Sequence, residues 1–150
     1  MSWNDLRKGR VSEPNREYFI TFTCNDRKPL FSNHQLAHAF CKMINLNELQ
    51  CDCLWATWVL MPNHFHGLLQ LQKNNLAQVV GKLKGASARK INQHLQISGP
   101  VWQPSFYDRA LRTEDNRKDI ARYIIANPLR ANLVASIKDY PYWNSIYLPA

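Results

Sequence analysis

Residues 54–71, LWATWVLMPNHFHGLLQL, decide the fold. Residues 54–60 are almost all apolar, β-branched or aromatic, which predicts a heavily buried strand. Met61-Pro62-Asn63 predicts a turn, so that residues 64–71 form the second strand of an antiparallel hairpin. Because alternate side chains of a strand point to opposite faces, His64 and His66 are expected side by side on one face, with Phe65 in the core.

The segments around this hairpin complete a β-α-β-β-α-β order, which is typical of the ferredoxin-like (RRM-like) antiparallel α+β fold. Their periodicity and composition predict a strand at 17–24, a helix capped by Ser32 or Asn33 and running to Leu49, a helix at 76–95 and a strand at 106–111. C-terminal helices follow at 114–125 and from Asn127-Pro128 to Val134, because Pro128 cannot lie within a helix without kinking it.

A length of 150 residues predicts one domain, residues 1–150, with residues 1–16 as a loose basic arm. The hydrophobic content of 45% and charged content of 20% exclude general disorder. No apolar run approaches the ~20 residues that a bilayer requires, so no membrane partner is expected. Four irregularly spaced cysteines and the lack of a signal peptide indicate a cytoplasmic, nucleoid-associated protein.

The net charge of +8 favours a nucleic-acid partner. No acidic residue occurs from Cys53 to Tyr107, either by chance or because phosphates lie against this part of the chain. The candidate DNA-binding residues in this segment are four basic side chains and one aromatic side chain beside a Gly-Pro break, namely Lys82, Lys84, Arg89, Lys90 and Trp102.

The spacing of His64 and His66 suits one divalent cation between two imidazoles, although two histidines on a strand can also be simply exposed. Cys51 and Cys53 are separated by one residue and no second cysteine pair follows, so a zinc site is not expected. We interpret the His34/His38 pair, at helical spacing, as a surface feature.

Three runs in this order, MPNHFHGLLQL, VWQPSFYDRALR and ARYIIANPLRANLV, resemble the REP-associated tyrosine transposases of the single-tyrosine HUH (IS200-like) group. The resemblance covers residues 18–134. It implies that His64 and His66 bind Mg²⁺ or Mn²⁺, that Asn127 is a third ligand and that Tyr123 is the nucleophile. It also implies cleavage of single-stranded DNA beside a hairpin, at repetitive extragenic palindromes, with a 5′-phosphotyrosine intermediate and a free 3′-OH.

The residues themselves leave alternatives open. Tyr123 lies on the apolar stripe of its predicted helix and is otherwise expected in the core, and Asn127 is otherwise an N-cap for the next helix. Tyr107 is a second candidate nucleophile or a base-stacking residue. The three ligands implied by the resemblance are neutral, and imidazole suits Mn²⁺ better than Mg²⁺, so weak metal binding is expected. Both a monomer and a homodimer stay open.

The sequence therefore predicts a metal-dependent DNA-nicking and strand-transfer enzyme. The alternative is a catalytically silent module that binds single-stranded nucleic acid through aromatic side chains on an RRM-like sheet. The His pair together with Tyr123 distinguishes the two hypotheses, because a module that only binds needs neither.

Overall fold

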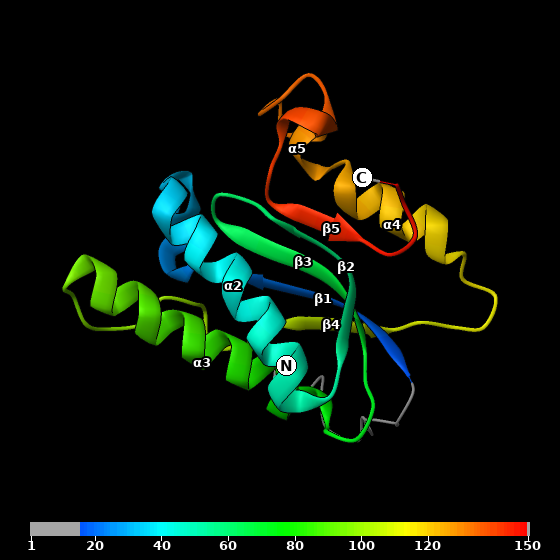
Figure 1. The fold of residues 1–150 in the computed structure, drawn as a ribbon. Helices are drawn as coiled ribbons and strands as arrows, with labels where there is room; N and C mark the ends of the chain where they lie inside the picture. Colours follow the sequence, from blue (N-terminus) through cyan, green and yellow to red (C-terminus); the bar gives the residue numbers. More distant parts are fainter. Residues whose placement is uncertain (1–15, 150) are drawn as a thin grey trace.

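The computed structural model describes residues 16–149, which form an antiparallel sheet with helices on both faces (Figure 1). The strands are β1 (Glu17–Thr23), β2 (Leu54–Leu60), β3 (His64–Gln70), β4 (Tyr107–Ala110) and β5 (Trp143–Ser145). The helices are α2 (His34–Cys51), α3 (Leu76–Leu95), α4 (Arg117–Ile125) and α5 (Asn127–Arg130), with 3₁₀ turns at Asn25–Arg27, Leu30–Ser32 and Ile137–Asp139.

The strands lie in the order β4-β1-β3-β2-β5, and every neighbouring pair is antiparallel. The expected α+β class is confirmed, and the chain order from β1 to β4 is the predicted β-α-β-β-α-β order. The hairpin of residues 54–71 forms as β2 and β3, and β3 lies between β1 and β2 at the centre of the sheet.

Each face of the sheet has its own hydrophobic core. Helices α2 and α3 cover one face, where Phe22, Phe40 and Phe65 pack together. Helix α4 covers the other face, and α5 follows it directly (Figure 1). On this second face Leu68 and Ile124 belong to a separate cluster of buried side chains. Because both faces of β3 are buried, this strand contacts both layers of helices.

A register shift between Trp55 and Thr57 explains why β2 is buried almost continuously rather than in alternation. An extra residue at a β-bulge changes the face to which the following side chains point. The Trp55 ring lies over Gly67 of β3, where a Cβ atom would be 2.7 Å from Trp55 Cε3. Glycine at this position therefore makes room for the indole, which also packs edge-on against Phe65.

Helix α2 begins where the sequence indicated, because Asn33 Oδ1 accepts hydrogen bonds from the backbone N–H groups of Gln35 and Leu36. Helix α4 begins at Arg117, three residues later than predicted, because Asn116 caps it by accepting from the backbone N–H of Asp119. The predicted helix through Val134 instead ends at Arg130, soon followed by Asn132 with a positive φ of 58°.

Strand β5 was not predicted, because three residues are too few for a periodic pattern. It pairs with β2, and the hydroxyl groups of Thr57 and Ser145 lie 2.8 Å apart. The predicted basic arm at residues 1–16 lies outside the described residues, except for Arg16. Among the described residues no helix is both long and apolar enough to cross a membrane.

We expect Gly67→Ala to lower the free energy of unfolding by about 1–3 kcal/mol, because the added methyl group would overpack the core against Trp55. Urea unfolding at equilibrium measures this change. Gly81→Ala is the matched control: position 81 is exposed on α3 with open space around a built Cβ atom, so the same substitution should stabilise by about 0.5–1 kcal/mol. Equal effects at the two positions would contradict the proposed packing of Trp55 over Gly67.

Candidate metal and nucleophile site

His64 and His66 lie on the sheet face that α4 covers. Leu68, two residues beyond His66, is buried with Ile124 of α4. Side chains two apart on a strand share a face, so both imidazoles point the same way, as their spacing predicted. Their ring centroids are 4.6 Å apart, and the ring planes are inclined at 83°.

The Nδ1 atom of each imidazole forms a hydrogen bond with a neighbouring side chain. Asn63 Oδ1, in the turn before β3, accepts a hydrogen bond from His64 Nδ1 at 2.6 Å. Thr21, opposite His66 on β1, places its Oγ1 atom 2.7 Å from His66 Nδ1. Within residues 16–149 neither Nε2 atom takes part in a hydrogen bond. Metal-binding histidines are typically oriented in this way, with one nitrogen held and the other available to the ion.

Burial keeps both imidazoles neutral. It is the largest cause of the low pKa of His66, about 3, to which electrostatic interactions with His64 and Arg130 also contribute. It also lowers the pKa of His64, assisted by the charge of Arg27. A neutral imidazole has a lone pair ready for a cation, so a metal ion would not have to displace a proton.

Tyr123 is on α4 but is not a core residue, and 59% of it is exposed. The buried side of α4 consists of Ala121, Ile124 and Ile125, and Tyr123 falls outside this stripe. The alternative expectation of a core tyrosine is therefore wrong. An exposed phenol on a helix that packs over the His64 and His66 face is accessible to a substrate.

Asn127 is the first residue of α5, four residues beyond Tyr123. The expectation that it caps this helix is wrong, because Ala126 occupies the N-cap position and no side chain makes the capping hydrogen bond. Instead, Asn127 Nδ2 donates to the carbonyl oxygen of Ile124 at 2.9 Å. This hydrogen bond uses the NH₂ group of the amide. The other amide atom, Oδ1, makes no capping hydrogen bond and is the atom that could bind a cation.

Arg130, the last residue of α5, contacts Tyr123. Its guanidinium carbon lies 4.2 Å from the centroid of the Tyr123 ring, and Nη2 donates to the Tyr123 carbonyl oxygen at 2.9 Å. Its charge also contributes to the low pKa of His66. Arg130 was not predicted as a site residue, because its only signal in the sequence is a basic side chain shortly after Asn127-Pro128.

The donor set fits a divalent cation bound by nitrogen and amide oxygen. His64 and His66 are neutral, close together and held at Nδ1, and Asn127 carries an amide oxygen on the next helical segment. Among the described residues no group of three or more His, Cys, Asp or Glu side chains could hold a metal ion. Any cation at this site would therefore depend on the histidine pair and on neutral oxygen donors.

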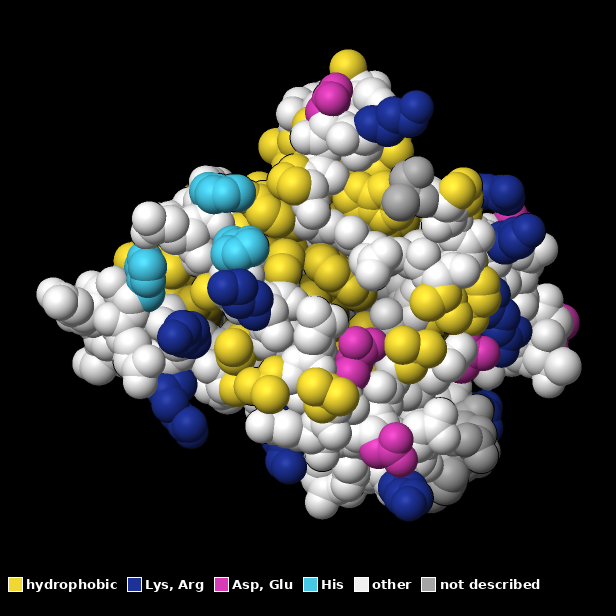
Figure 2. Space-filling model, viewed as in Figure 1, with side chains coloured by type: hydrophobic (Ala, Val, Ile, Leu, Met, Phe, Trp, Pro, Cys, Tyr) yellow, Lys and Arg dark blue, Asp and Glu magenta, His cyan; other side chains and the backbone are white. Residues whose placement is uncertain are grey.

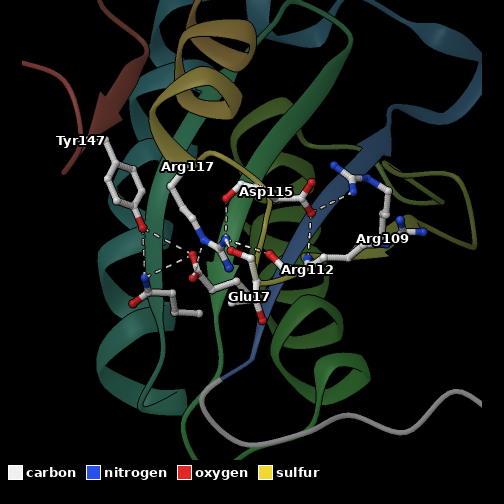
Figure 3. Close-up of polar contacts among 8 residues, drawn as sticks. Glu17, Arg109, Arg112, Asp115, Arg117 and Tyr147 are labelled. Carbon is white, nitrogen blue, oxygen red and sulfur yellow. Dashed lines mark hydrogen bonds and ion pairs between the residues drawn. The ribbon is translucent and has the colours of Figure 1, made fainter.

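A polar network fixes the start of α4 against the sheet (Figure 3). Arg117 Nε donates to Glu17 Oε1 of β1 at 3.1 Å, and Nη1 donates to the carbonyl oxygens of Arg112 and Asp115. Tyr147 reaches the same Glu17 carboxylate from the C-terminal segment. The backbone N–H of Arg112, the largest cause, and the charge of Arg109 lower the pKa of the Asp115 carboxyl group. This network constrains the position of α4, and with it the position of Tyr123.

The predicted phosphate-binding residues lie on α3, on the sheet face opposite the histidine pair, so the structure does not bring the two sets together. Lys82, Arg89 and Lys90 are exposed. Lys84 is half-buried, and its Nζ atom donates to the carbonyl oxygens of Gln103 at 2.8 Å and Ser105 at 3.0 Å. Lys84 therefore joins α3 to the segment before β4.

The expectation for Trp102 as a base-stacking residue needs correction. Trp102 is only 5% exposed, stacks on Phe31 and donates from Nε1 to Ser87 Oγ at 2.9 Å. Its ring is part of the core and offers no face to a base. Tyr107, on the edge strand β4, is 46% exposed, with its ring 6.4 Å from that of Phe19.

All four cysteines are free thiols, and burial raises the pKa of Cys24, Cys41 and Cys53 to about 12, so these three side chains are protonated at neutral pH. His34 and His38 are exposed on α2, as predicted, with ring centroids 6.3 Å apart. Figure 2 shows histidine side chains gathered beside Lys and Arg side chains on one flank of the molecule.

Comparison with known proteins defines the family. The profile of the IS200-like transposases matches residues 12–127, and the chain belongs to this family. An Escherichia coli K12 REP-associated tyrosine transposase is 23% identical over 128 residues, which covers 83% of this chain and 73% of that protein. A Haemophilus influenzae protein provisionally named in the same way is 28% identical over 94 residues, covering 55% of this chain, which spans about half (53%) of that relative.

Solved structures are similar to this chain in fold. The structure of a REP-associated tyrosine transposase bound to a REP hairpin matches with a TM-score of 0.71 at 20% identity. The match covers 89% of this chain and 79% of that one. The expected resemblance to REP-associated tyrosine transposases is thus confirmed by sequence and by fold.

We expect Lys84→Met to lower the free energy of unfolding by about 1–3 kcal/mol, because two carbonyl oxygens lose a charged hydrogen-bond donor. Lys82→Met, two positions away and exposed, should change it by less than about 0.5 kcal/mol. Urea unfolding of both variants measures the difference. A Lys84→Met protein as stable as Lys82→Met would show that Lys84 is not a structural contact.

Proposed function

We propose that this protein is a metal-dependent, single-tyrosine enzyme that cleaves and rejoins single-stranded DNA beside hairpins of repetitive extragenic palindromes. The observation that carries the proposal is the exposure of Tyr123 on a helix packed over the sheet face of His64 and His66. A tyrosine needed only for packing would lie on the buried stripe of α4. Membership of the IS200-like transposase family supports the same interpretation.

In the proposed reaction, the phenol oxygen of Tyr123 forms a bond to the phosphorus of a phosphodiester while the bond from phosphorus to the 3′ oxygen breaks. The phenol loses its proton and the leaving 3′ oxygen gains one through solvent. The products are a 5′-phosphotyrosine and a free 3′-OH. Because the phosphotyrosine remains an activated ester, a 3′-OH can attack it and restore the DNA backbone, which favours strand transfer over hydrolysis.

His64 and His66, together with Asn127, are the residues that would hold Mg²⁺ or Mn²⁺. A bound cation would polarise the phosphate and offset the negative charge that builds on it during attack. The neutral ligands favour weak binding by the free protein and suit Mn²⁺ at least as well as Mg²⁺. A protonated phenol is a poor nucleophile, so this assistance matters for attack by Tyr123 at neutral pH.

The proposed DNA partner has a hairpin and a single-stranded flank. A net charge of +8 supports a polyanionic partner, and a relative of similar fold was solved bound to a REP hairpin. Lys82, Arg89 and Lys90 lie on the opposite face of the sheet from His64, so we propose them as phosphate contacts remote from the cleaved bond.

The alternative function is binding of single-stranded nucleic acid without cleavage. The ring of the exposed Tyr107 neighbours that of Phe19, whose centroid is 5.9 Å from that of His66. RRM-like sheets bind unpaired bases through aromatic side chains of this kind. Such a module would need neither Tyr123 nor a cation, so loss-of-function variants at Tyr123 and His64 separate the two functions.

Covalent trapping tests the proposed function. The full chain is mixed with labelled single-stranded hairpin oligonucleotides from repeats of the source genome, with Mn²⁺ or Mg²⁺, and run on a denaturing gel. We expect a protein–DNA adduct with the wild type and none with Tyr123→Phe, because only the phenol oxygen can form the phosphotyrosine. His64→Ala should also abolish the adduct, because it removes a metal ligand.

Tyr107→Phe is the matched control, because it removes the hydroxyl group of the other candidate nucleophile and should leave the adduct unchanged. An adduct that persists in Tyr123→Phe would assign the nucleophile to another residue. Hairpin binding by the wild type without an adduct, and without any effect of Tyr123→Phe, would favour the silent binding module.

We expect Thr21→Val to weaken Mn²⁺ binding and Mn²⁺-supported adduct formation by about 10–100-fold, because His66 loses the hydrogen bond that orients its ring. Titration calorimetry measures the first quantity and single-turnover kinetics the second. Thr23→Val, opposite His64 on the same face of β1, is the control: among the described residues His64 Nδ1 bonds to Asn63 and not to Thr23, so neither quantity should change. Identical behaviour of the two variants would exclude an orienting role for the Thr21 hydroxyl group.

A further inference from the structure

Arg130 lies against the candidate nucleophile, Tyr123. The guanidinium carbon is 4.2 Å from the centroid of the Tyr123 ring, and Nη2 donates to the Tyr123 carbonyl oxygen at 2.9 Å. Arg130 therefore contacts Tyr123 at its ring and at its backbone. A planar guanidinium group on an aromatic face restricts the directions in which the ring can turn.

Arg130 differs in its ion pairing from three other arginines of the described residues. Within residues 16–149 it forms no salt bridge, whereas Arg109, Arg117 and Arg122 each pair with a carboxylate. The phosphodiester of a DNA strand is an anion that a guanidinium group binds well.

Arg130 also retains hydrogen-bonding capacity. An arginine has five N–H donors in a planar fork that matches two oxygens of a phosphate group. One hydrogen bond to the Tyr123 carbonyl oxygen uses only part of this capacity, and the side chain is exposed. The same guanidinium group can thus contact the tyrosine ring with its face and a phosphate with its edge.

We propose that Arg130 holds the ring of Tyr123 in place and binds the phosphodiester that Tyr123 attacks. This inference rests on the proposed function, because it assigns a role within that reaction. Arg130 supplies a permanent positive charge to a site whose other residues, His64, His66 and Asn127, are neutral. Charge that accumulates on the phosphate during attack is stabilised by this group as well as by the cation.

Arg122 provides the matched control. It precedes Tyr123 on α4, is exposed, and pairs with Asp119 at 3.3 Å. It is therefore an arginine next to Tyr123 in sequence that pairs with a carboxylate and does not stack on the Tyr123 ring. Replacing Arg122 removes the same charge from the protein and leaves the stacking on Tyr123 in place.

The experiment measures single-turnover adduct formation at saturating hairpin oligonucleotide with Mn²⁺, and hairpin affinity separately, for the full chain and its variants. We expect Arg130→Ala to reduce the saturated rate by about 100-fold or more, as for other donors to a developing anion, with a much smaller loss of affinity. Arg122→Ala should stay within about threefold of the wild type, as expected for an exposed ion pair. Added guanidinium ions at non-denaturing concentration should restore part of the rate to Arg130→Ala.

Two further measurements separate an effect on the reaction from a folding defect. Thermal unfolding shows whether each variant is folded, and the rate of Arg130→Lys shows whether charge alone is sufficient. Lysine retains the charge but not the planar fork, so its rate should lie between those of Arg130→Ala and the wild type. A folded Arg130→Ala protein with the wild-type saturated rate, or one altered only in affinity, would overturn the inference while leaving the proposed function intact. A wild-type protein that forms no adduct would overturn the proposed function, and this inference with it.

Discussion

The candidate site depends on the packing of the central strand β3 between two different hydrophobic layers. Phe65 and Leu69 are buried against α2 and α3, whereas Leu68 is buried against α4. A shift of this strand by one residue would move Phe65 out of the aromatic core and turn the imidazoles into it. The register of β3 is therefore strongly specified by hydrophobic burial, and the direction of His64 and His66 follows from it.

The electrostatics of the site suit an anionic substrate. Burial keeps His64 and His66 neutral, and the positive charges that act on them come from Arg27 and Arg130. A Mg²⁺ site built from carboxylates would carry negative charge before its substrate arrived and would repel a phosphate. Neutral ligands avoid this repulsion, at the cost of weak affinity for the cation alone. Tyr123 lies at the edge of this neutral-to-positive region, in contact with Arg130.

Local signals predicted most elements well, and the errors occurred where distant contacts decide the outcome. The capping side chain of Asn33 marked the start of α2, and alternation placed Phe65 in the core. Trp102 was misjudged because the residues that bury it, Phe31 and Ser87, come from two other segments. Lys84 was predicted to bind DNA like its exposed neighbour Lys82, but in the folded protein its Nζ atom contacts the segment before β4. Residues within one segment do not reveal such contacts.

The sequence by itself determined the β-α-β-β-α-β order, the shared face of His64 and His66, and the resemblance that singled out Tyr123. These features depend on periodicity and on short motifs, which are properties of neighbouring residues. Only the tertiary structure decided that Tyr123 is exposed, that Arg130 stacks on it, and that α3 lies on the face away from the histidines. The physical reason is that burial and charge at each position are set by side chains distant in sequence, which only the packed sheet and helices bring together.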